Sequence, residues 1–136
     1  MPEDKPEITE LVNAQMPLGA TLGIRTYGGS EEIEATLAWA PELCTAGGVL
    51  HGGVLMALAD SAGAVCAFVN LPAGGRTVTI ESKTNFFAAV REGDVRARSR
   101  PLHRGRTTTV IETDLFDATD RHIARTTQTQ AVTGAD

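Results

Sequence analysis

The sequence is short of cysteine and of basic residues, and both shortages exclude classes of protein. Its two cysteines, Cys44 and Cys66, have neither another cysteine nor a histidine at metal-ligand spacing. Such a pair, without a secretory signal, is typical of reduced thiols packed in a fold. Twelve lysines and arginines face 17 acids, for a net charge of −5. This balance argues against general nucleic-acid binding, which requires many phosphates to be neutralised.

We also expect no secretory signal and no membrane-spanning helix. The first six residues are acidic and do not place an apolar stretch after a basic one. Residues 46–71 are the longest apolar stretch, but they include five glycines, His51 and Asp60. An acid at the centre of a bilayer is costly. We therefore interpret the stretch as a buried helix of a soluble, cytoplasmic protein.

The length and composition are those of one globular domain. A chain of 136 residues can bury a core without metal or disulfide support and leaves no room for a second domain. The hydrophobic fraction of 42% and the charged fraction of 21% match a folded protein rather than a disordered chain. We expect a single domain over residues 1–136, in which residues 1–18 form an N-terminal helical segment.

Hydrophobic periodicity predicts a short helix and a hairpin in the first third of the chain. Residues 7–16 place apolar side chains at helical spacing, with acids in the first turn where the helix dipole favours them. Residues 22–27 are typical of a strand and residues 28–30 of a turn. Alternation of apolar and other residues from Ile33 to Trp39 predicts a second strand with one face exposed to water.

The rest of the chain predicts a long helix followed by four strands. Residues 52–68 follow a loop of small residues and are apolar on nearly every side, as in an enclosed helix. Short turns separate the later runs and favour antiparallel pairing, without crossover helices. These runs are residues 76–90, 94–103, 106–116 and 122–132. The predicted class is α+β, an antiparallel sheet wrapped around a long central helix. One such sheet covers only part of the helix and leaves open edges, so we expect a homodimer.

His51, Gly52 and Gly53 lie where the central helix should start. The first backbone N–H groups of a helix have no intrahelical acceptor, and glycines let a ligand approach them closely. Such an end can bind an anion or a developing oxyanion. Two alternatives remain: the glycines only allow a tight turn, and His51 only positions the loop.

Asp60 is the only acid between Leu43 and Gly75, and it lies within the apolar helix. Burial raises the pKa of a carboxyl group, which suits it to general-base or nucleophilic work. Eight residues separate it from Gly52, roughly 12 Å along a helix axis, so one reacting carbonyl cannot touch both in one chain. Two antiparallel central helices in a dimer would bring Gly52 of one copy to Asp60 of the other. Asp60 could instead cap a loop or pair with an arginine.

Other polar residues offer weaker signals. Alternation places Thr77, Thr79 and Glu81 on one strand face, where Thr79 could orient water or the Asp60 carboxylate, although strand propensity alone explains a threonine. Phe86 could supply core or the wall of an acyl pocket. A strip of basic residues could hold the phosphates of a nucleotide-like carrier or simply form a solvated face. It comprises Arg96, Arg98, Arg100, His103, Arg104 and Arg106. No serine or cysteine forms a convincing catalytic triad.

Together these motifs resemble the hotdog-fold acyl-CoA thioesterases of the phenylacetate-degradation (PaaI-like) type. The resemblance covers roughly residues 20–133 and is carried by Leu50-His51-Gly52-Gly53, Asp60, Thr79-Ile80-Glu81, Asn85-Phe86-Phe87 and Glu92-Gly93. It implies a sheet wrapped on the central helix, two sites across a dimer interface, further pairing into a homotetramer, and hydrolysis of a thioester. No cofactor is implied, because coenzyme A is part of the substrate.

The resemblance also implies a role for individual residues. Gly52 would donate its backbone N–H to the thioester oxygen, while His51 and Gly53 shape the loop. Asp60 of the other chain would be the nucleophile or general base, and Thr79 matches a Ser/Thr that holds the water or the carboxylate. Many relatives have an asparagine six residues before the histidine; this chain has Thr45 at that substrate-binding position. Arg104 and Arg106 would contact the coenzyme A phosphates.

Three functions follow from these residues. An acyl-CoA thioesterase explains why a lone carboxylate lies in an apolar helix. A hydratase or dehydratase of the same fold is the second hypothesis. Enzymes of that kind have a histidine–phenylalanine motif at the position where this chain has His-Gly-Gly. The third is a non-catalytic acyl-CoA-binding module, which would have no need for an acid facing the thioester.

Overall fold

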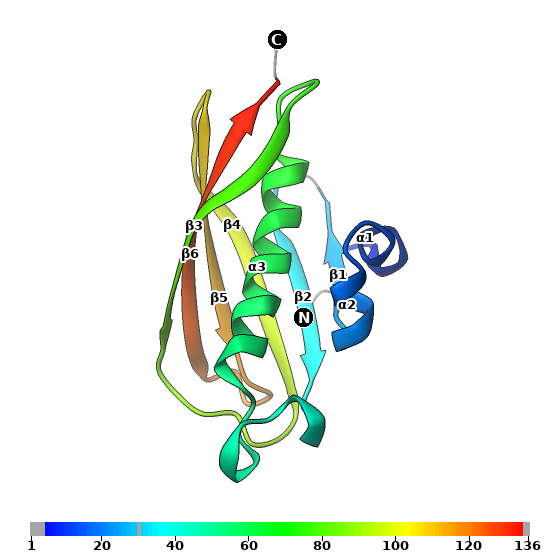
Figure 1. The fold of residues 1–136 in the computed structure, drawn as a ribbon, viewed down its shortest axis with the longest axis vertical. Helices are drawn as coiled ribbons and strands as arrows, with labels where there is room; N and C mark the ends of the chain where they lie inside the picture. Colours follow the sequence, from blue (N-terminus) through cyan, green and yellow to red (C-terminus); the bar gives the residue numbers. More distant parts are fainter. Residues whose placement is uncertain (1–4, 30, 135–136) are drawn as a thin grey trace.

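The computed structural model describes residues 5–29 and 31–134, and within them one sheet wraps around one long helix (Figure 1). The helices are α1 (Thr9–Gln15), α2 (Pro17–Leu22) and α3 (Gly52–Val69), with short 3-10 turns at Pro41–Leu43 and Ala46–Gly48. The strands are β1 (Arg25–Gly28), β2 (Ile33–Ala38), β3 (Arg76–Phe86), β4 (Asp94–Arg104), β5 (Thr108–Phe116) and β6 (His122–Thr133).

The six strands form one antiparallel sheet in the order β1-β2-β4-β5-β6-β3. Helix α3 packs across its concave face and contacts β2, β3, β4, β5 and β6, and Figure 1 shows it lying in front of the sheet. The predicted α+β class, with an antiparallel sheet around a central helix, is confirmed. Strands β1 and β3 are the two edges.

Helix α3 buries one face and leaves the other bare. Leu55, Leu58, Ala59, Ala62 and Cys66 are 3% exposed or less and pack on the sheet. The opposite face follows the i, i+4 spacing of a helix and is half-buried or exposed; it carries Gly52, Met56, Asp60, Ala64 and Phe68. The prediction that one sheet covers only part of this helix is confirmed. By length and composition α3 could also span a membrane, but it packs here as the core helix of the fold.

The N-terminal region differs from the prediction. The first helix is shorter than residues 7–16, and a second helix, α2, follows it and includes Leu22, where the predicted strand begins. Pro17 stands at the first turn of α2, where its missing N–H is harmless, and Gly23 ends the helix at φ +73°. Strand β1 therefore starts at Arg25 rather than residue 22.

The face of β2 that should be exposed to water is partly covered. Glu34 is 3% exposed, and Lys5 Nζ lies 3.5 Å from its carboxylate. The N-terminal segment therefore covers this part of the sheet's outer face, because Gly28 N–H also donates to the Pro6 carbonyl at 3.0 Å.

Strand β3 ends earlier than predicted and contains a bulge. It stops at Phe86 instead of residue 90, and its register against β6 shifts between Thr79 and Glu81. Thr79 pairs with the inward-facing Gln130, whereas Glu81 pairs with Thr129, which faces the opposite side. The prediction that Glu81 shares a face with Thr79 is therefore wrong, because the extra residue of a bulge reverses the alternation.

Arg96, Arg98 and Arg100 lie on the outer face of β4, away from α3. The inward side chains of this strand are Val95, Ala97 and Ser99, all 0% exposed. Arg96 approaches Asp120 at 3.4 Å, and Arg100 binds Glu112 at 2.8 Å. The guanidinium groups of Arg96 and Arg98 also lie over the ring of Phe116. These three arginines therefore pack and pair with other side chains on the outer surface of the sheet.

The two cysteines are free thiols, as predicted. Cys66 is buried on the side of α3 that faces the sheet, and its Sγ donates to the Glu31 carbonyl at 3.2 Å. Burial raises the pKa of the Cys66 thiol to about 12, so it stays protonated and unreactive at neutral pH.

Candidate active site

The loop before α3 is held tightly and presents a free backbone donor. Leu50 N–H donates to Val90 O at 2.9 Å, and His51 N–H donates to Leu43 O at 3.0 Å. His51 is the N-cap, with an extended backbone at ψ 132°, and its ring Nδ1 accepts the Gly53 N–H at 2.8 Å. Among the described residues the Gly52 N–H has no acceptor. The helix therefore begins with one unpaired N–H at Gly52.

The hydrogen bond from Gly53 also sets the tautomer of His51. Because Nδ1 accepts a hydrogen bond, a neutral ring carries its proton on Nε2. The His51 ring is exposed, so its Nε2–H is a second available donor beside the Gly52 N–H. The position therefore gathers two donors at the positive end of the α3 dipole.

Phe86 lies directly against this helix start. A Cβ placed on Gly52 would be 3.3 Å from Phe86 Cζ, closer than ordinary van der Waals contact. The ring is 48% exposed and can form one wall beside the free N–H. The bulge in β3 makes this contact possible, because it turns Phe86 toward the helix side of the sheet.

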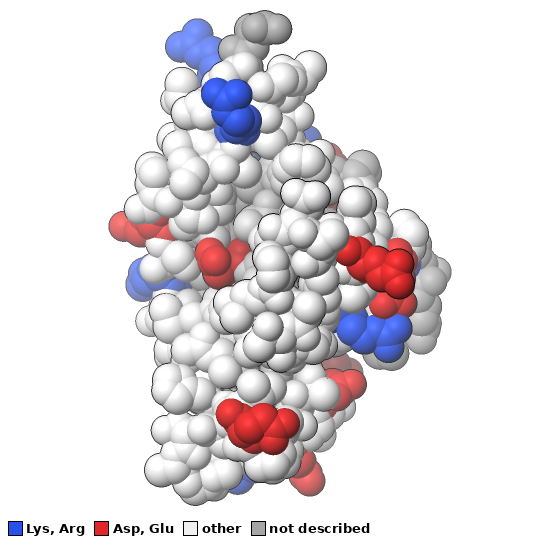
Figure 2. All heavy atoms as spheres, turned by 45° about the vertical axis from the view of Figure 1, so that its right-hand side comes forward, with Lys and Arg blue, Asp and Glu red and all other residues white. Residues whose placement is uncertain are grey.

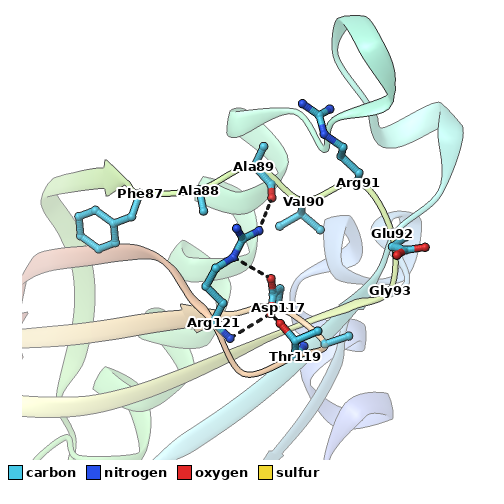
Figure 3. Close-up of a pocket in the computed structure, with 11 residues that line it drawn as sticks. Phe87, Ala88, Ala89, Val90, Arg91, Glu92, Gly93, Asp117, Thr119 and Arg121 are labelled. Carbon is cyan, nitrogen blue, oxygen red and sulfur yellow. Dashed lines mark hydrogen bonds and ion pairs between the residues drawn. The ribbon is translucent and has the colours of Figure 1, made fainter.

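A second pinned loop supports the helix start. Residues 87–93 and the turn at residues 117–121 border a polar pocket of about 810 Å³. In Figure 3, Arg121 bridges this pocket, with Nε donating to Asp117 at 3.1 Å and Nη2 donating to the Ala89 carbonyl at 3.0 Å. These bonds fix the loop whose Val90 carbonyl receives the Leu50 N–H. Arg121 therefore contributes to placing His51 and Gly52.

Asp60 lies in the middle of the bare face of α3. Its Oδ1 accepts a hydrogen bond from Gln128 Nε2 at 2.6 Å, and it forms no ion pair with a described residue. In a single chain Asp60 is exposed. It is therefore less buried than the sequence predicts. Partial burial nevertheless raises the pKa of its carboxyl, and the hydrogen bond from Gln128 opposes that rise.

A chain of buried hydrogen bonds lies beneath this carboxylate. Gln128 Nε2 also donates to Thr79 Oγ1 at 3.3 Å, and Gln130 Nε2 donates to the same oxygen at 2.7 Å. Gln130 Oε1 in turn accepts from Thr77 Oγ1 at 3.0 Å. Thr79 thus joins the Asp60 network through Gln128 rather than by touching the carboxylate.

Sequence reasoning missed both glutamines, although a signal was present. Thr126, Gln128 and Gln130 alternate on the face of β6 that packs against α3, and they are 1%, 0% and 1% exposed. Long amides at buried strand positions need hydrogen-bond partners. The lone acid of the facing helix was the natural candidate, but pairing them required the strand order.

Gly52 and Asp60 do not meet within one chain. Both belong to the uninterrupted helix Gly52–Val69, so the separation of roughly 12 Å along its axis holds. The arrangement brings His51, Gly52, Gly53 and Phe86 together at one end, and it brings Asp60 and Thr79 together near the middle.

Three other predicted site residues do not contact Gly52 within one chain. Thr45 is exposed, and its backbone N–H donates to Val49 within the loop. Arg104 pairs with Glu31 near the C-terminal end of α3, and Arg106 is exposed in the β4–β5 turn. In one chain the β4–β5 turn therefore lies at the opposite end from the start of α3, as Figure 1 shows.

An apolar pocket of about 340 Å³ lies beyond Asp60 along the same helix face. Ala64, one turn after Asp60, and Thr77, two residues before Thr79, belong to its lining. Leu11 and Phe68, which are 68% and 67% exposed, form its rim on α1 and α3. Its full lining is Ile8, Leu11, Val12, Gln15, Met16, Ala64, Val65, Phe68, Val69 and Thr77.

Comparison with known proteins agrees with this geometry. Residues 47–124 match the family model described as the thioesterase superfamily. A Mycobacterium tuberculosis protein provisionally classed as an esterase is 32% identical over 127 residues, which cover 90% of this chain and 91% of that protein. The 1,4-dihydroxy-2-naphthoyl-CoA hydrolase of Escherichia coli is 31% identical over 104 residues, with 76% of each chain covered.

A solved structure shows the same architecture. The crystal structure of a thioesterase from Haemophilus influenzae matches with a TM-score of 0.86 and 29% identity, over 93% of this chain and 90% of that one. The region that the family model matches, residues 47–124, includes the end of the loop before α3, the whole of α3, strands β3, β4 and β5, and the start of β6. The wrapped sheet is thus the hotdog fold, and the chain belongs to the thioesterase superfamily.

Proposed function

We propose that this protein hydrolyses an acyl-CoA thioester to a free acid and coenzyme A. The observation that carries the proposal is the Asp60 carboxylate, which stands without a cation on a bare apolar helix face and is held by one amide donor. Its raised pKa keeps it basic enough to deprotonate water or to attack the carbonyl. The free Gly52 N–H would stabilise the developing oxyanion.

A two-fold dimer would bring these two parts together. The bare face of α3 runs through Gly52, Met56, Asp60 and Ala64, so antiparallel helices crossing near Met56 would set Gly52 of one protomer against Asp60 of its partner. β3 is an edge strand with open backbone groups. In Figure 2, turned from the view in which α3 lies in front of the sheet, charged side chains are few and uncharged atoms form most of the surface.

A second apolar patch would serve further association. Val78 and Ile80 on β3 are 59% and 61% exposed, and Val78 points to the side of the sheet away from Thr77 and Thr79. Two adjacent bare aliphatic side chains on an edge strand favour contact with another copy. We assign this patch to the pairing of dimers into a homotetramer.

The apolar pocket beside Asp60 would receive the acyl group. It begins one helical turn beyond the carboxylate and is lined almost entirely by apolar side chains. Its volume of about 340 Å³ lies at the small end of ligand pockets and suits an aryl or medium-length aliphatic acyl group. The relative from Escherichia coli is named 1,4-dihydroxy-2-naphthoyl-CoA hydrolase, which supports a coenzyme A thioester as the substrate. Arg104 and Arg106 would meet the phosphates of coenzyme A.

Replacing Asp60 tests the reaction directly. Asp60→Asn keeps the shape and the acceptor for Gln128 but removes the base, so the kcat for hydrolysis should fall about a hundredfold or more. Thiol release across a panel of aryl- and alkyl-CoAs measures this. In the wild type, activity should fall on acidification at a pH above the ordinary range of an aspartate, because the pKa of Asp60 is raised.

The same variant carries its own stability control. A carboxyl group with a raised native pKa stabilises the fold only when protonated, and that contribution disappears as pH rises through the native pKa. Charged Asp60 therefore costs stability at pH 7, and Asp60→Asn should have a Tm equal to or above that of the wild type. An active Asp60→Asn protein would contradict the mechanism.

Gly52→Pro tests the backbone donor. Proline lacks the N–H but is well tolerated at the first helical position, and the extended backbone of His51 suits a residue before proline. We expect kcat to fall about a hundredfold to a thousandfold while the far-ultraviolet circular dichroism is retained. Gly52→Ala is the matched control, since it adds the same Cβ against Phe86 and keeps the N–H. Equal losses in the two variants would point to steric blockage instead.

Mixing two inactive variants tests whether each site is shared between protomers. In dimers formed at random from Gly52→Pro and Asp60→Asn chains, half are heterodimers, and each heterodimer has one intact site. Activity should recover to about a quarter of the wild-type level. Each variant refolded alone serves as the background. No recovery in proven heterodimers would show that both groups act within one chain.

Ala64→Phe tests the acyl pocket. The larger side chain should fill the space beyond Asp60 and lower kcat/KM for bulky acyl-CoAs about tenfold or more, because their acyl groups lose burial. Acetyl-CoA is the control substrate, since its short acyl group stops before residue 64. A uniform loss for all substrates, together with dissociation on size-exclusion chromatography, would instead identify the pocket as a subunit contact.

A further inference from the structure

We propose that Gln128 is a positioning residue that holds the Asp60 carboxylate in its reactive orientation, and that Gly63 keeps open the slot in which Gln128 lies. This inference rests on the proposed function, in which Asp60 is the reacting carboxylate. It adds a residue from β6, at the far end of the chain, to a site otherwise built from α3 and β3.

The contact geometry defines the orientation of the Gln128 amide. Its Nε2 faces two oxygens, Asp60 Oδ1 at 2.6 Å and Thr79 Oγ1 at 3.3 Å. The reverse orientation would place the amide oxygen against the carboxylate. Gln128 is 0% exposed, so no rotation into solvent competes with this arrangement, and the donor stays fixed beneath Asp60.

Gly63 explains how a buried glutamine fits below the helix. It lies three residues after Asp60, on the side of α3 that faces β6. A Cβ at this position would lie 1.9 Å from Gln128 Oε1 and 3.1 Å from its Cδ, and the first distance is sterically impossible. A glycine within a helix costs roughly 1 kcal/mol relative to alanine. The helix therefore accepts a weaker residue at the one point where the amide passes.

The amide oxygen of Gln128 shows that this side chain is not explained by the stability of the fold. Gln128 Oε1 is buried and has no hydrogen-bond partner among the described residues. A buried acceptor without a partner destabilises a fold. The presence of an amide here, despite this cost and despite the glycine opposite it, is explained by what its nitrogen does for Asp60.

A neutral donor is well suited to this task. A lysine or arginine in the same place would neutralise the carboxylate and lower its basicity strongly. The amide gives direction with a much weaker electrostatic effect, so Asp60 remains basic. Thr79, which accepts hydrogen bonds from both Gln128 and Gln130, is held by the same network and keeps its own hydroxyl proton available for another acceptor.

Gln128→Met tests the proposal, because methionine has a similar shape but no donor. We expect kcat for acyl-CoA hydrolysis to fall about tenfold to a hundredfold, as for loss of a hydrogen bond to a charged group, with little change in KM. The acidic limb of the pH–rate profile should move up by about one pH unit. A ¹³C NMR titration of the Asp60 carboxyl should show the same upward movement without relying on turnover.

Thr126→Val is the matched control. Thr126 lies two residues before Gln128 on the same buried face of β6, and its hydroxyl pairs with Thr84 at 2.7 Å instead of with Asp60. Loss of the Thr126 hydroxyl should lower Tm, but it should move neither the acidic limb of the pH–rate profile nor the titration of the Asp60 carboxyl. If Gln128→Met does not fold, Gln128→Leu replaces it, because leucine also lacks a donor and adds no charge, and the expected upward shift of the Asp60 titration is the same.

The outcomes separate this inference from the proposed function. A folded Gln128 variant with wild-type kcat, acidic limb and Asp60 titration would overturn the positioning role, even where Asp60→Asn is inactive. An active Asp60→Asn protein would instead overturn the proposed function. Gly63→Ala should reproduce the Gln128→Met shift, because the new methyl group displaces the glutamine.

Discussion

The structure depends on the packing of one face of α3 against the concave side of a single sheet. Leu55, Leu58, Ala59 and Ala62 are almost completely buried there, and loss of that apolar contact would leave neither element with a core. Because one sheet covers only one side, the same packing also leaves a bare helix face. The requirement that forms the core thus creates the surface on which the chemistry is proposed.

Two glutamines of β6 are buried in this core and support the site. Gln128 occupies an inward position of β6 opposite the fully buried Ile111 of β5, and Gln130 lies opposite the buried Thr109. The two glutamines connect β3, β6 and α3 through side-chain hydrogen bonds at 2.6–3.3 Å. A buried polar network of this kind fixes the relative position of the elements it joins, here the helix with Asp60 and the strand with Thr79.

Local patterns in the sequence were sufficient for the order of the main elements and for the antiparallel sheet around a central helix. The glycines and the lone acid also drew attention to Gly52 and Asp60. The partners of Asp60 were beyond such reasoning, because Gln128 is 68 residues away and the contact depends on β6 lying between β5 and β3. The bulge near Thr79 was hidden for a similar reason: it shows only in the register of β3 against β6, a strand that lies far along the chain. The helix α2 was missed because a proline usually interrupts a helix, whereas Pro17 stands at the first turn of this one.

The bulge in β3 has a consequence for how this strand can change. Thr79 and Phe86 are seven residues apart, an odd number that would place them on opposite faces of a regular strand. The single extra residue lets both face α3, one toward the middle of the helix and one toward its start. Insertion or deletion of one residue between them would therefore turn one of the two side chains away from the helix. Insertion or deletion of two residues would leave both facing it.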